Sequence, residues 1–285
     1  MKTKICQKST ENSSLKFHWI VWTLFLIITN WSSNVYAQDI VEIGDQSANC
    51  QQDPDCINRL HPAIPMSSRA KSGATIIFHT RNASDFNLDP EAPPDARKGD
   101  AGFGTVHPLT GPVYIESAEP GDVLKVRIID IDPGVWAYTV ISRIGFISDQ
   151  ITGPLRILWQ LNQEYAVSED LPGIRIPNRS FPGIVTVLPG PEQHFDMMAR
   201  EAELLKAGGA VMPATYLKHA SPKDVCGEGG SHAGECLRTI PPREHGGNMD
   251  IRYLKKGVSI YLPCYIPGCG PVSYTHLTLP TNREV

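Results

Sequence analysis

Glycine and proline interrupt this chain so often that long helices have little room. Each occurs 24 times among 285 residues, together about a sixth of the chain. Glycine reaches backbone conformations that other residues avoid, and proline fixes one backbone dihedral, so both concentrate in turns. With 41% hydrophobic and 20% charged residues, the chain still has enough apolar surface for a core. The composition therefore favours a folded, mainly β protein with many turns and short strands.

Short apolar runs between these turns predict the strands. The run at 123–131 places Leu124, Val126 and Ile128 on one face and Lys125 and Arg127 on the other, which predicts a strand with one buried face. Residues 38–74 show no sustained period and are expected to be irregular, and residues 85–104 are expected to form a long loop. The expected strands are 75–78, 113–115, 123–131, 155–161, 174–176, 184–188, 251–254 and 258–262.

One segment predicts a helix of several turns. Pro191 suits its first turn, and Gly208-Gly209 suits its end. Apolar residues recur between them at helical spacing, so we expect them to face the core. These residues are Phe195, Met198, Ala202 and Leu205.

The N-terminus has the three parts of a secretory signal peptide. Lysines come first, an apolar run follows at 19–28, and Val35-Tyr36-Ala37 fits the small-residue cleavage rule. We predict cleavage after Ala37, which would leave a secreted or periplasmic protein with no membrane attachment. A retained anchor is the alternative, but the apolar run is shorter than the roughly 20 residues of a spanning helix.

The net charge argues against a nucleic-acid partner. The chain carries −4. Residues 1–37 contribute +3, which leaves −7 on residues 38–285. Proteins that bind nucleic acids need a basic footprint, so this class of partner is excluded.

Six cysteines follow the leader, and they fall into three locally spaced pairs. An even number in an exported protein predicts disulfides. Six cysteines allow 15 pairings, of which the short loops favour three local ones. A zinc site is the rival interpretation, but no C-x-x-C pair is present. The favoured pairs are Cys50–Cys56, Cys226–Cys236 and Cys264–Cys269.

Four segments together resemble the acetamidase/formamidase family, in the family's order. They are GFGTVHPLTGPVYIESAEPGDVLKVRIIDI (102–131), RSFPGIVTVLPG (179–190), AREAELLKAGGAVMPA (199–214) and LRTIPPREHGGNMDIRYLKKGVSIYLP (237–263). The resemblance runs from about Thr75 to Gly268. It implies a β-sandwich-like fold with minor α+β elements, assembly into a homo-oligomer, and release of ammonia from small amides such as formamide or acetamide.

Two segments depart from the family pattern. The loop between Cys226 and Cys236 looks like an insertion. After Gly268 the family would continue into a G-D-G-H segment, whereas this chain ends in PVSYTHLTLPTNREV, which resembles a translated sequencing adapter. We therefore expect a domain at 75–270 that is incomplete, and a foreign tail at 271–285 that finds no partner in the fold. Such a chain is expected to be poorly soluble and inactive.

Amide hydrolysis needs an activated nucleophile, a polarised carbonyl and a proton for the leaving nitrogen. A bound metal can supply the first two, and we expect a divalent ion, zinc or calcium. The chain has no G-x-S-x-G elbow and no H-E-x-x-H motif, so a serine triad of that type and a zincin are unsupported.

The densest polar cluster is 243–250, and the resemblance favours function there. Asp250 would act as a base or metal ligand, Asn248 would donate to the substrate carbonyl, and Glu244 would be a general acid/base. Gly246 and Gly247 would let the backbone approach the substrate. From the residues alone, a glycine turn with local hydrogen bonds is the competing interpretation.

Three histidines lie outside the acidic and amide positions of this cluster. His245 is a candidate substrate contact, and His107 is a candidate metal ligand or substrate contact, although either is equally compatible with a structural role. His232, in the inserted loop, is expected to be solvated. A non-catalytic relative that binds small amides or serves a structural role is the main alternative to an enzyme. A carbohydrate-binding module is a weaker alternative, since only Trp136 and Trp159 follow the leader.

Overall fold

The computed structural model describes residues 39–83, 85, 104–141, 148–153, 155–162, 164–209 and 214–276. The predicted leader at 1–37 and most of the expected loop at 85–104 lie outside these residues, so both stay predictions. None of the described helices is both long and apolar enough to cross a lipid bilayer. The described residues are mainly strand, which confirms the expected fold class.

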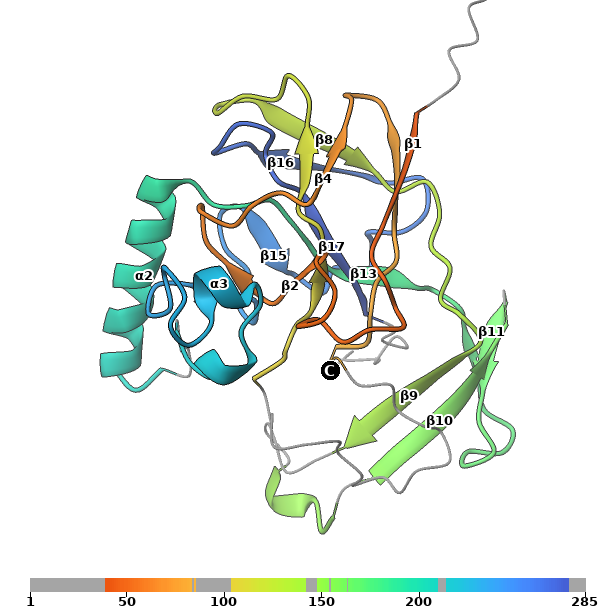
Figure 1. Ribbon diagram of the computed structural model, residues 1–285. Coiled ribbons are helices and arrows are strands. Elements are labelled where there is room, and N and C mark those ends of the chain that lie inside the picture. The colour runs from red at the N-terminus through yellow and green to blue at the C-terminus, as the bar shows by residue number, and fades with distance from the viewer. Residues whose placement is uncertain are drawn as a thin grey trace, which may run out of the picture. The chain divides into compact units, whose positions relative to one another are not determined.

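A five-stranded antiparallel sheet lies at the centre of the fold (Figure 1). All six residues of β13 are buried, as expected for a strand with neighbours on both sides and both faces covered. The strands, in sheet order, are β15 (Gly246–Asn248), β13 (Phe181–Thr186), β17 (Val272–His276), β6 (Leu109–Thr110) and β2 (Cys56–Ile57).

A second sheet has four antiparallel strands, β9 (Trp136–Ile141), β10 (Leu155–Leu161), β11 (Tyr165–Val167) and β12 (Arg175–Pro177), each hydrogen-bonded to the next. Its buried residues form a cluster of their own, which includes Ile157 and Trp159. Alternation along 155–161 predicted this strand, and the structure confirms it.

Four two-stranded pairs complete the fold. In β8, Leu124 and Val126 are half-buried, while Lys125 and Arg127 are exposed, which confirms the predicted face. The pairs are β8 (Val123–Arg127) with β16 (Ser259–Pro263), β1 (Ile40–Ile43) with β5 (Thr75–Phe78), β4 (Ser68–Ala70) with β7 (Val113–Ile115), and β3 (Arg59–Leu60) with β14 (Leu237–Arg238).

The predicted helix is α2 (Pro191–Lys206), and its ends agree with the proline and glycine signals. Its buried face was predicted only in part, because Met198 packs against the main core cluster, whereas Phe195 and Leu205 are exposed. His194, Met197 and Glu201 are buried, whereas Phe195 is 71% exposed. Polar contacts explain this orientation of the helix. His194 hydrogen-bonds to the Glu235 carbonyl and Glu201 accepts from Arg243, so both side chains face the rest of the protein. The other helices are short: η1 (Ser148–Gln150), η2 (Leu217–His219) and α3 (Lys223–Cys226).

Two further expectations are wrong. Residues 38–74 are not irregular throughout, because the short strands β1 to β4 lie in this range and pair with strands far along the chain, which local pattern cannot reveal. Residues 251–254 form a turn closed by a hydrogen bond from Leu254 N–H to the Ile251 carbonyl, not a strand. The strand predicted at 184–188 begins earlier, at Phe181, with a register irregularity between Pro182 and Ile184.

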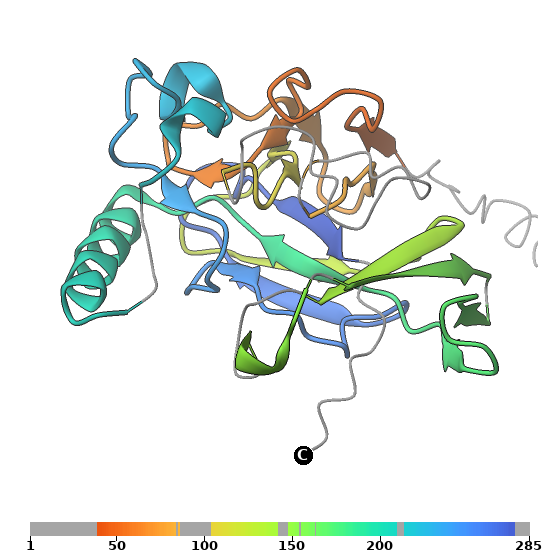
Figure 2. The ribbon, with the colours of Figure 1, turned by 90° about the horizontal axis from the view of Figure 1, so that it is seen from below.

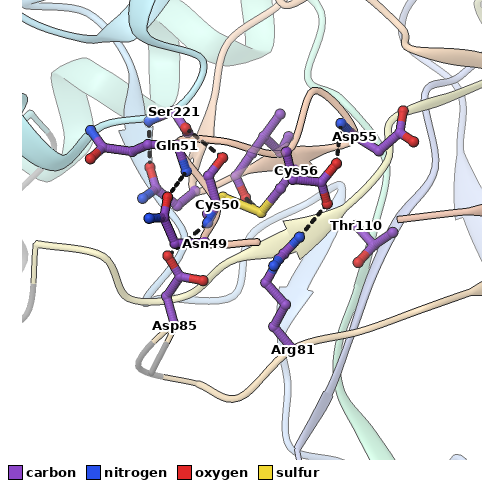
Figure 3. The surroundings of a disulfide bond; sticks show 12 residues. Asn49, Cys50, Gln51, Asp55, Cys56, Arg81, Asp85, Thr110 and Ser221 are labelled. Carbon is purple, nitrogen blue, oxygen red and sulfur yellow. Dashed lines mark hydrogen bonds and ion pairs between the residues drawn. A yellow bond between two sulfur atoms is a disulfide. The ribbon is translucent and has the colours of Figure 1, made fainter. Parts of the chain in front are cut away.

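All three predicted disulfides are present. Figure 3 shows the surroundings of Cys50–Cys56, where the Cys50 N–H donates to Asp85 and the Ser221 hydroxyl donates to the Cys50 carbonyl. Nearby, Arg81 forms a buried ion pair with Asp53. The hydrogen bond from Ser221 therefore joins this disulfide loop to a residue that precedes α3.

Residues 272–276 form the middle strand of the central sheet. β17 lies between β13 and β6, and the turned view in Figure 2 shows it beside β13. The expectation that the tail finds no partner is therefore wrong for these residues. The foreign origin of residues 271–285 stays a prediction.

Candidate active site

The segment 243–250, where the catalytic residues are predicted from the sequence, lies along the buried strand β13. β15 pairs with β13 in antiparallel register, with Gly246 opposite Thr186 and Asn248 opposite Ile184. Segment 243–250 is therefore fixed to the centre of the fold.

The paired glycines make a close approach to protein backbone. Gly246 and Gly247 have φ values of +99° and +117°, in the region that favours glycine. A Cβ on Gly246 would lie 2.5 Å from the Val185 carbonyl oxygen, and one on Gly247 would lie 3.2 Å from the Pro242 Cα. Packing against β13 is a sufficient reason for Gly246, and substrate contact at either glycine stays a prediction.

His245 is fully buried and bonded to Thr186. The Thr186 hydroxyl donates to the His245 carbonyl at 2.9 Å, and its Oγ1 lies 2.6 Å from Nδ1 of the ring. Nδ1–H therefore points to Oγ1, and Nε2 is an acceptor with no hydrogen-bond partner. Burial lowers the pKa of His245 to about 3, so the ring is neutral at physiological pH.

Two adjacent ion pairs attach helix α2 to this segment. Arg243 donates to both carboxylate oxygens of Glu201, at 2.6 and 3.0 Å, and their side chains are 1% and 6% exposed. Glu244 accepts two hydrogen bonds from Arg200, and these side chains are 49% and 54% exposed. The hydrogen bonds from Arg200 lower the pKa of Glu244 to about 2. Glu244 is therefore ionised at neutral pH, which opposes the predicted role as a general acid.

Asn248 and Asp250 stand at the far end of the segment. The Asn248 amide nitrogen donates to the Ile240 carbonyl at 2.9 Å, and its Oδ1 is buried without a hydrogen-bond partner. Asp250 is exposed, with φ +49°, and its N–H donates to the Gly183 carbonyl. The catalytic roles of both residues stay predictions.

His107 is buried and tied to the strand region that precedes this segment. Its N–H donates to the Thr239 hydroxyl oxygen at 2.7 Å, and that hydroxyl lies 3.3 Å from the His107 carbonyl. Among the described residues, the structure does not bring His107 and Asp250 into a group of three or more metal-ligand side chains.

Sequence reasoning missed a second cluster, of three histidines and a glutamate. His61 follows β3, His194 lies in the first turn of α2, and His232 and Glu235 lie in the inserted loop after α3. The His61 ring stacks on His232, with centroids 4.1 Å apart, and meets the His194 ring edge-on at 4.5 Å. Glu235 Oε2 lies 2.8 Å from His232 Nδ1 and 3.7 Å from His61 Nε2. His232 is therefore a packed member of this cluster, and the expectation of a solvated side chain holds only in part, since the side chain is 34% exposed.

The cluster favours neutral rings beside an ionised carboxylate. Burial, together with the neighbouring His194 and His232, lowers the pKa of His61 to about 4. Burial also lowers the pKa of His194, whose Nε2–H donates to the Glu235 carbonyl at 2.8 Å. The hydrogen bond from His232 lowers the pKa of Glu235. At neutral pH, His61 and His194 are thus uncharged beside the ionised Glu235.

Helix α2 joins the two clusters, because His194 contacts the histidine cluster and Arg200 and Glu201 contact segment 243–250. The inserted loop follows α3 and meets α2 through the hydrogen bond from His194 to the Glu235 carbonyl. The spacing of His232 and Glu235 inside a disulfide loop is the one local signal for the second cluster. His61 has no such signal, since it reaches the loop only through the fold.

Comparisons with known proteins agree with this architecture. A formamidase of Methylophilus methylotrophus is 29% identical over 244 residues, which are 81% of this chain and 60% of that protein. An acetamidase of Mycolicibacterium smegmatis is 30% identical over 235 residues, which are 74% of this chain and 56% of that protein. The chain thus spans about 60% of the length of the curated relatives it matches.

Solved structures share the fold. A gamma lactamase from Delftia acidovorans superposes with a TM-score of 0.73 at 28% identity, over 84% of this chain and 62% of that one. An acetamidase from Bacillus halodurans gives 0.57 at 20% identity, over the same shares, and shows the fold alone. The sequence model of the Acetamidase/Formamidase family matches residues 42–274, nearly all of the described chain, and the protein therefore belongs to the acetamidase/formamidase family.

Proposed function

We propose that this protein hydrolyses small linear amides of the formamide and acetamide type, with the help of a divalent metal. The observation that carries the proposal is the family match over residues 42–274, supported by relatives named formamidase and acetamidase. The buried strand β13, the segment 243–250 and the histidine cluster place polar groups of both charges close to one helix.

The reaction consumes one water for each amide. Water adds to the carbonyl carbon, the C–N bond breaks, and the nitrogen leaves as ammonia after it takes up a proton. The other product is the carboxylate. Asp250, which is exposed, is our candidate for the base that accepts the proton of water, and the Asn248 amide is the candidate donor to the carbonyl oxygen.

A divalent metal can polarise a carbonyl and lower the pKa of a bound water, and the described residues that would hold one are His61, His232 and Glu235 rather than His107 and Asp250. The donor set supports zinc over calcium. The described residues hold one group of three or more potential ligands, and two of its three members are histidines. Zinc accepts imidazole nitrogen readily, whereas calcium takes six to eight oxygen ligands.

Export is part of the proposal. The leader-like residues 1–37 motivate it, and three formed disulfides are what an oxidising compartment allows. Mass spectrometry of the mature N-terminus tests this, since cleavage after Ala37 gives Gln38 as the first residue. Assembly into a homo-oligomer also stays a proposal, which light scattering on the purified protein would check.

The decisive assay measures ammonia and carboxylate together. Disulfide-intact protein is incubated with formamide, acetamide or propionamide, with and without added zinc, and we expect the two products in equal amounts. Folded protein that binds these amides by calorimetry without releasing ammonia would contradict the proposal and identify a non-catalytic amide binder instead. Protein boiled after reduction controls for spontaneous hydrolysis.

A further inference from the structure

We propose that His61, His232 and Glu235 bind one zinc ion in this protein. Zinc binding is inferred from the geometry of the three side chains alone. Its use in amide hydrolysis would rest on the function proposed above.

The spacing of the ligand atoms suits a tetrahedral ion. Each of the three residues offers one ligand atom, and these atoms all lie within 4.8 Å of one another. Glu235 Oε2 lies 2.8 Å from His232 Nδ1 and 3.7 Å from His61 Nε2. Ligands at 2.0–2.2 Å from zinc in tetrahedral geometry are about 3.4 Å apart. Shifts of about half an ångström bring these two distances to that spacing, and the two histidine nitrogens, which lie within 4.8 Å of each other, must close by at most about 1.4 Å.

The site is closed on one side and open on the other. The His61 side chain is 7% exposed, whereas those of His232 and Glu235 are 34% and 61% exposed. Three protein ligands with a solvent-facing fourth position are the arrangement of a catalytic zinc, and two histidines with one glutamate are a known set for it. A structural zinc would instead have four protein ligands.

The loop that carries two of the ligands is held in place before any ion binds. The Cys226–Cys236 disulfide closes it directly beside Glu235. Within it, the His232 N–H donates to the Val225 carbonyl at 2.8 Å, and the Glu235 N–H donates to the His232 carbonyl at 3.0 Å. From α2, His194 donates to the Glu235 carbonyl, so it orients a ligand residue as an outer-shell partner does.

Zinc must change the hydrogen bonding of His61. The Ala63 N–H donates to His61 Nδ1 at 3.0 Å, so the neutral ring carries its proton on Nε2, the nitrogen that faces Glu235. Binding through Nε2 requires this proton to leave Nε2. The neutral ring then carries its proton on Nδ1, so Nδ1 no longer accepts the bond from Ala63. The stacked rings of His61 and His232 must also tilt so that their lone pairs converge. The ion also replaces the hydrogen bond between His232 Nδ1 and Glu235. Two hydrogen bonds are a small loss beside two nitrogen–zinc bonds and one oxygen–zinc bond, so the exchange favours the ion.

Calorimetric titration tests the site directly. Zinc chloride is titrated into chelator-treated, disulfide-intact protein that has no histidine tag, and we expect one ion per chain. His232→Ala and Glu235→Gln should each weaken binding at least about tenfold. Both side chains reach solvent, so circular dichroism should show native folds for both variants.

A second histidine–glutamate pair in the chain supplies the control. His79 Nε2 lies 2.7 Å from Glu42 Oε1, but no third ligand joins them among the described residues. His79→Ala should therefore keep the affinity of the parent protein. The proposal is wrong if the parent binds no zinc, if His232→Ala and Glu235→Gln bind as the parent does, or if His79→Ala loses the same affinity.

The same samples separate this site from the proposed activity. Zinc bound at one per chain without ammonia release leaves the site intact and contradicts the amidase proposal. Full ammonia release by zinc-free protein keeps the amidase proposal and shows that zinc at this site takes no part in it.

Discussion

Helix α2 and segment 243–250 are joined by two neighbouring ion pairs that differ mainly in burial. Comparing variants of the two pairs therefore tests how burial affects the contribution of an ion pair to stability. The inner pair, Glu201 with Arg243, has side chains 6% and 1% exposed. The outer pair, Glu244 with Arg200, has side chains 49% and 54% exposed. We would compare Glu201→Gln with Glu244→Gln, since each change removes one negative charge and keeps the shape of the side chain.

The structure predicts very different costs for the two variants. Removing one partner of a buried pair leaves an uncompensated charge and costs about 3–5 kcal/mol. Glutamine can still accept one bond from Arg243, so the lower end of this range applies. Losing an exposed pair costs about 0–1 kcal/mol. For a domain of this size, each kcal/mol of lost stability lowers Tm by about 2–4 °C. We therefore expect Glu201→Gln to lower Tm by about 6–12 °C and Glu244→Gln to lower it by at most about 4 °C.

Thermal unfolding followed by circular dichroism, with the disulfides intact, measures the difference. A second variant tests the cause. Adding Arg243→Met to Glu201→Gln removes the stranded positive charge and should restore part of the lost stability. If Glu201→Gln lowers Tm no more than Glu244→Gln does, then burial is not what makes the inner pair strong, and the reasoning fails.

Three further predictions follow from the segment 243–250. Between about pH 6.5 and pH 3 the unfolded chain protonates its histidine at 245 while the folded protein keeps His245 neutral, so stability should fall as the pH falls. Thermal melts at several pH values across this range should show stability falling with pH, and His245→Gln should reduce this dependence. Equal pH dependence in both proteins would contradict a neutral His245 in the folded state. Gly246→Ala places a Cβ 2.5 Å from the Val185 oxygen and should cost at least about 2 kcal/mol more than Gly257→Ala, whose Cβ meets nothing within 4 Å; denaturant midpoints compare them. Asp250→Asn keeps a residue that tolerates φ +49° and should lower ammonia release about a hundredfold without unfolding the protein, whereas near-normal turnover would indicate a structural role.

Local features of the fold were predictable from the sequence. The strands at 75–78 and 155–161, the alternating faces of β8 and the ends of α2 depend on residues close in the chain. The three disulfides were predictable for the same reason, since each closes a loop of at most 10 residues. What failed depends on distant partners. β1 to β4 form because strands far along the chain complete their hydrogen bonds, and the sequence of residues 38–74 contains no local pattern that predicts this pairing.

The candidate site divides in the same way. The segment 243–250 stands out by composition, and the structure places it against β13. The face of α2 was misjudged because periodicity counts apolar residues, while His194 and Glu201 turn inward to meet Glu235 and Arg243. The histidine cluster was missed because His61, α2 and the inserted loop meet only in the folded chain.

The place of β17 in the central sheet determines when, during synthesis or export, the sheet can be completed. A chain that leaves the ribosome or an export channel N-terminus first presents β6 and β13 well before β17, the strand that lies between them. Until residues 272–276 arrive, β13 lacks one of its two neighbours, and an apolar strand with an open edge is prone to pair with another chain. The disulfides do not have to wait, because each closes a loop that is complete within a few residues of synthesis. Oxidation can thus precede folding in this protein, and the interval between the exit of residue 186 and that of residue 272 is when a chaperone would matter most.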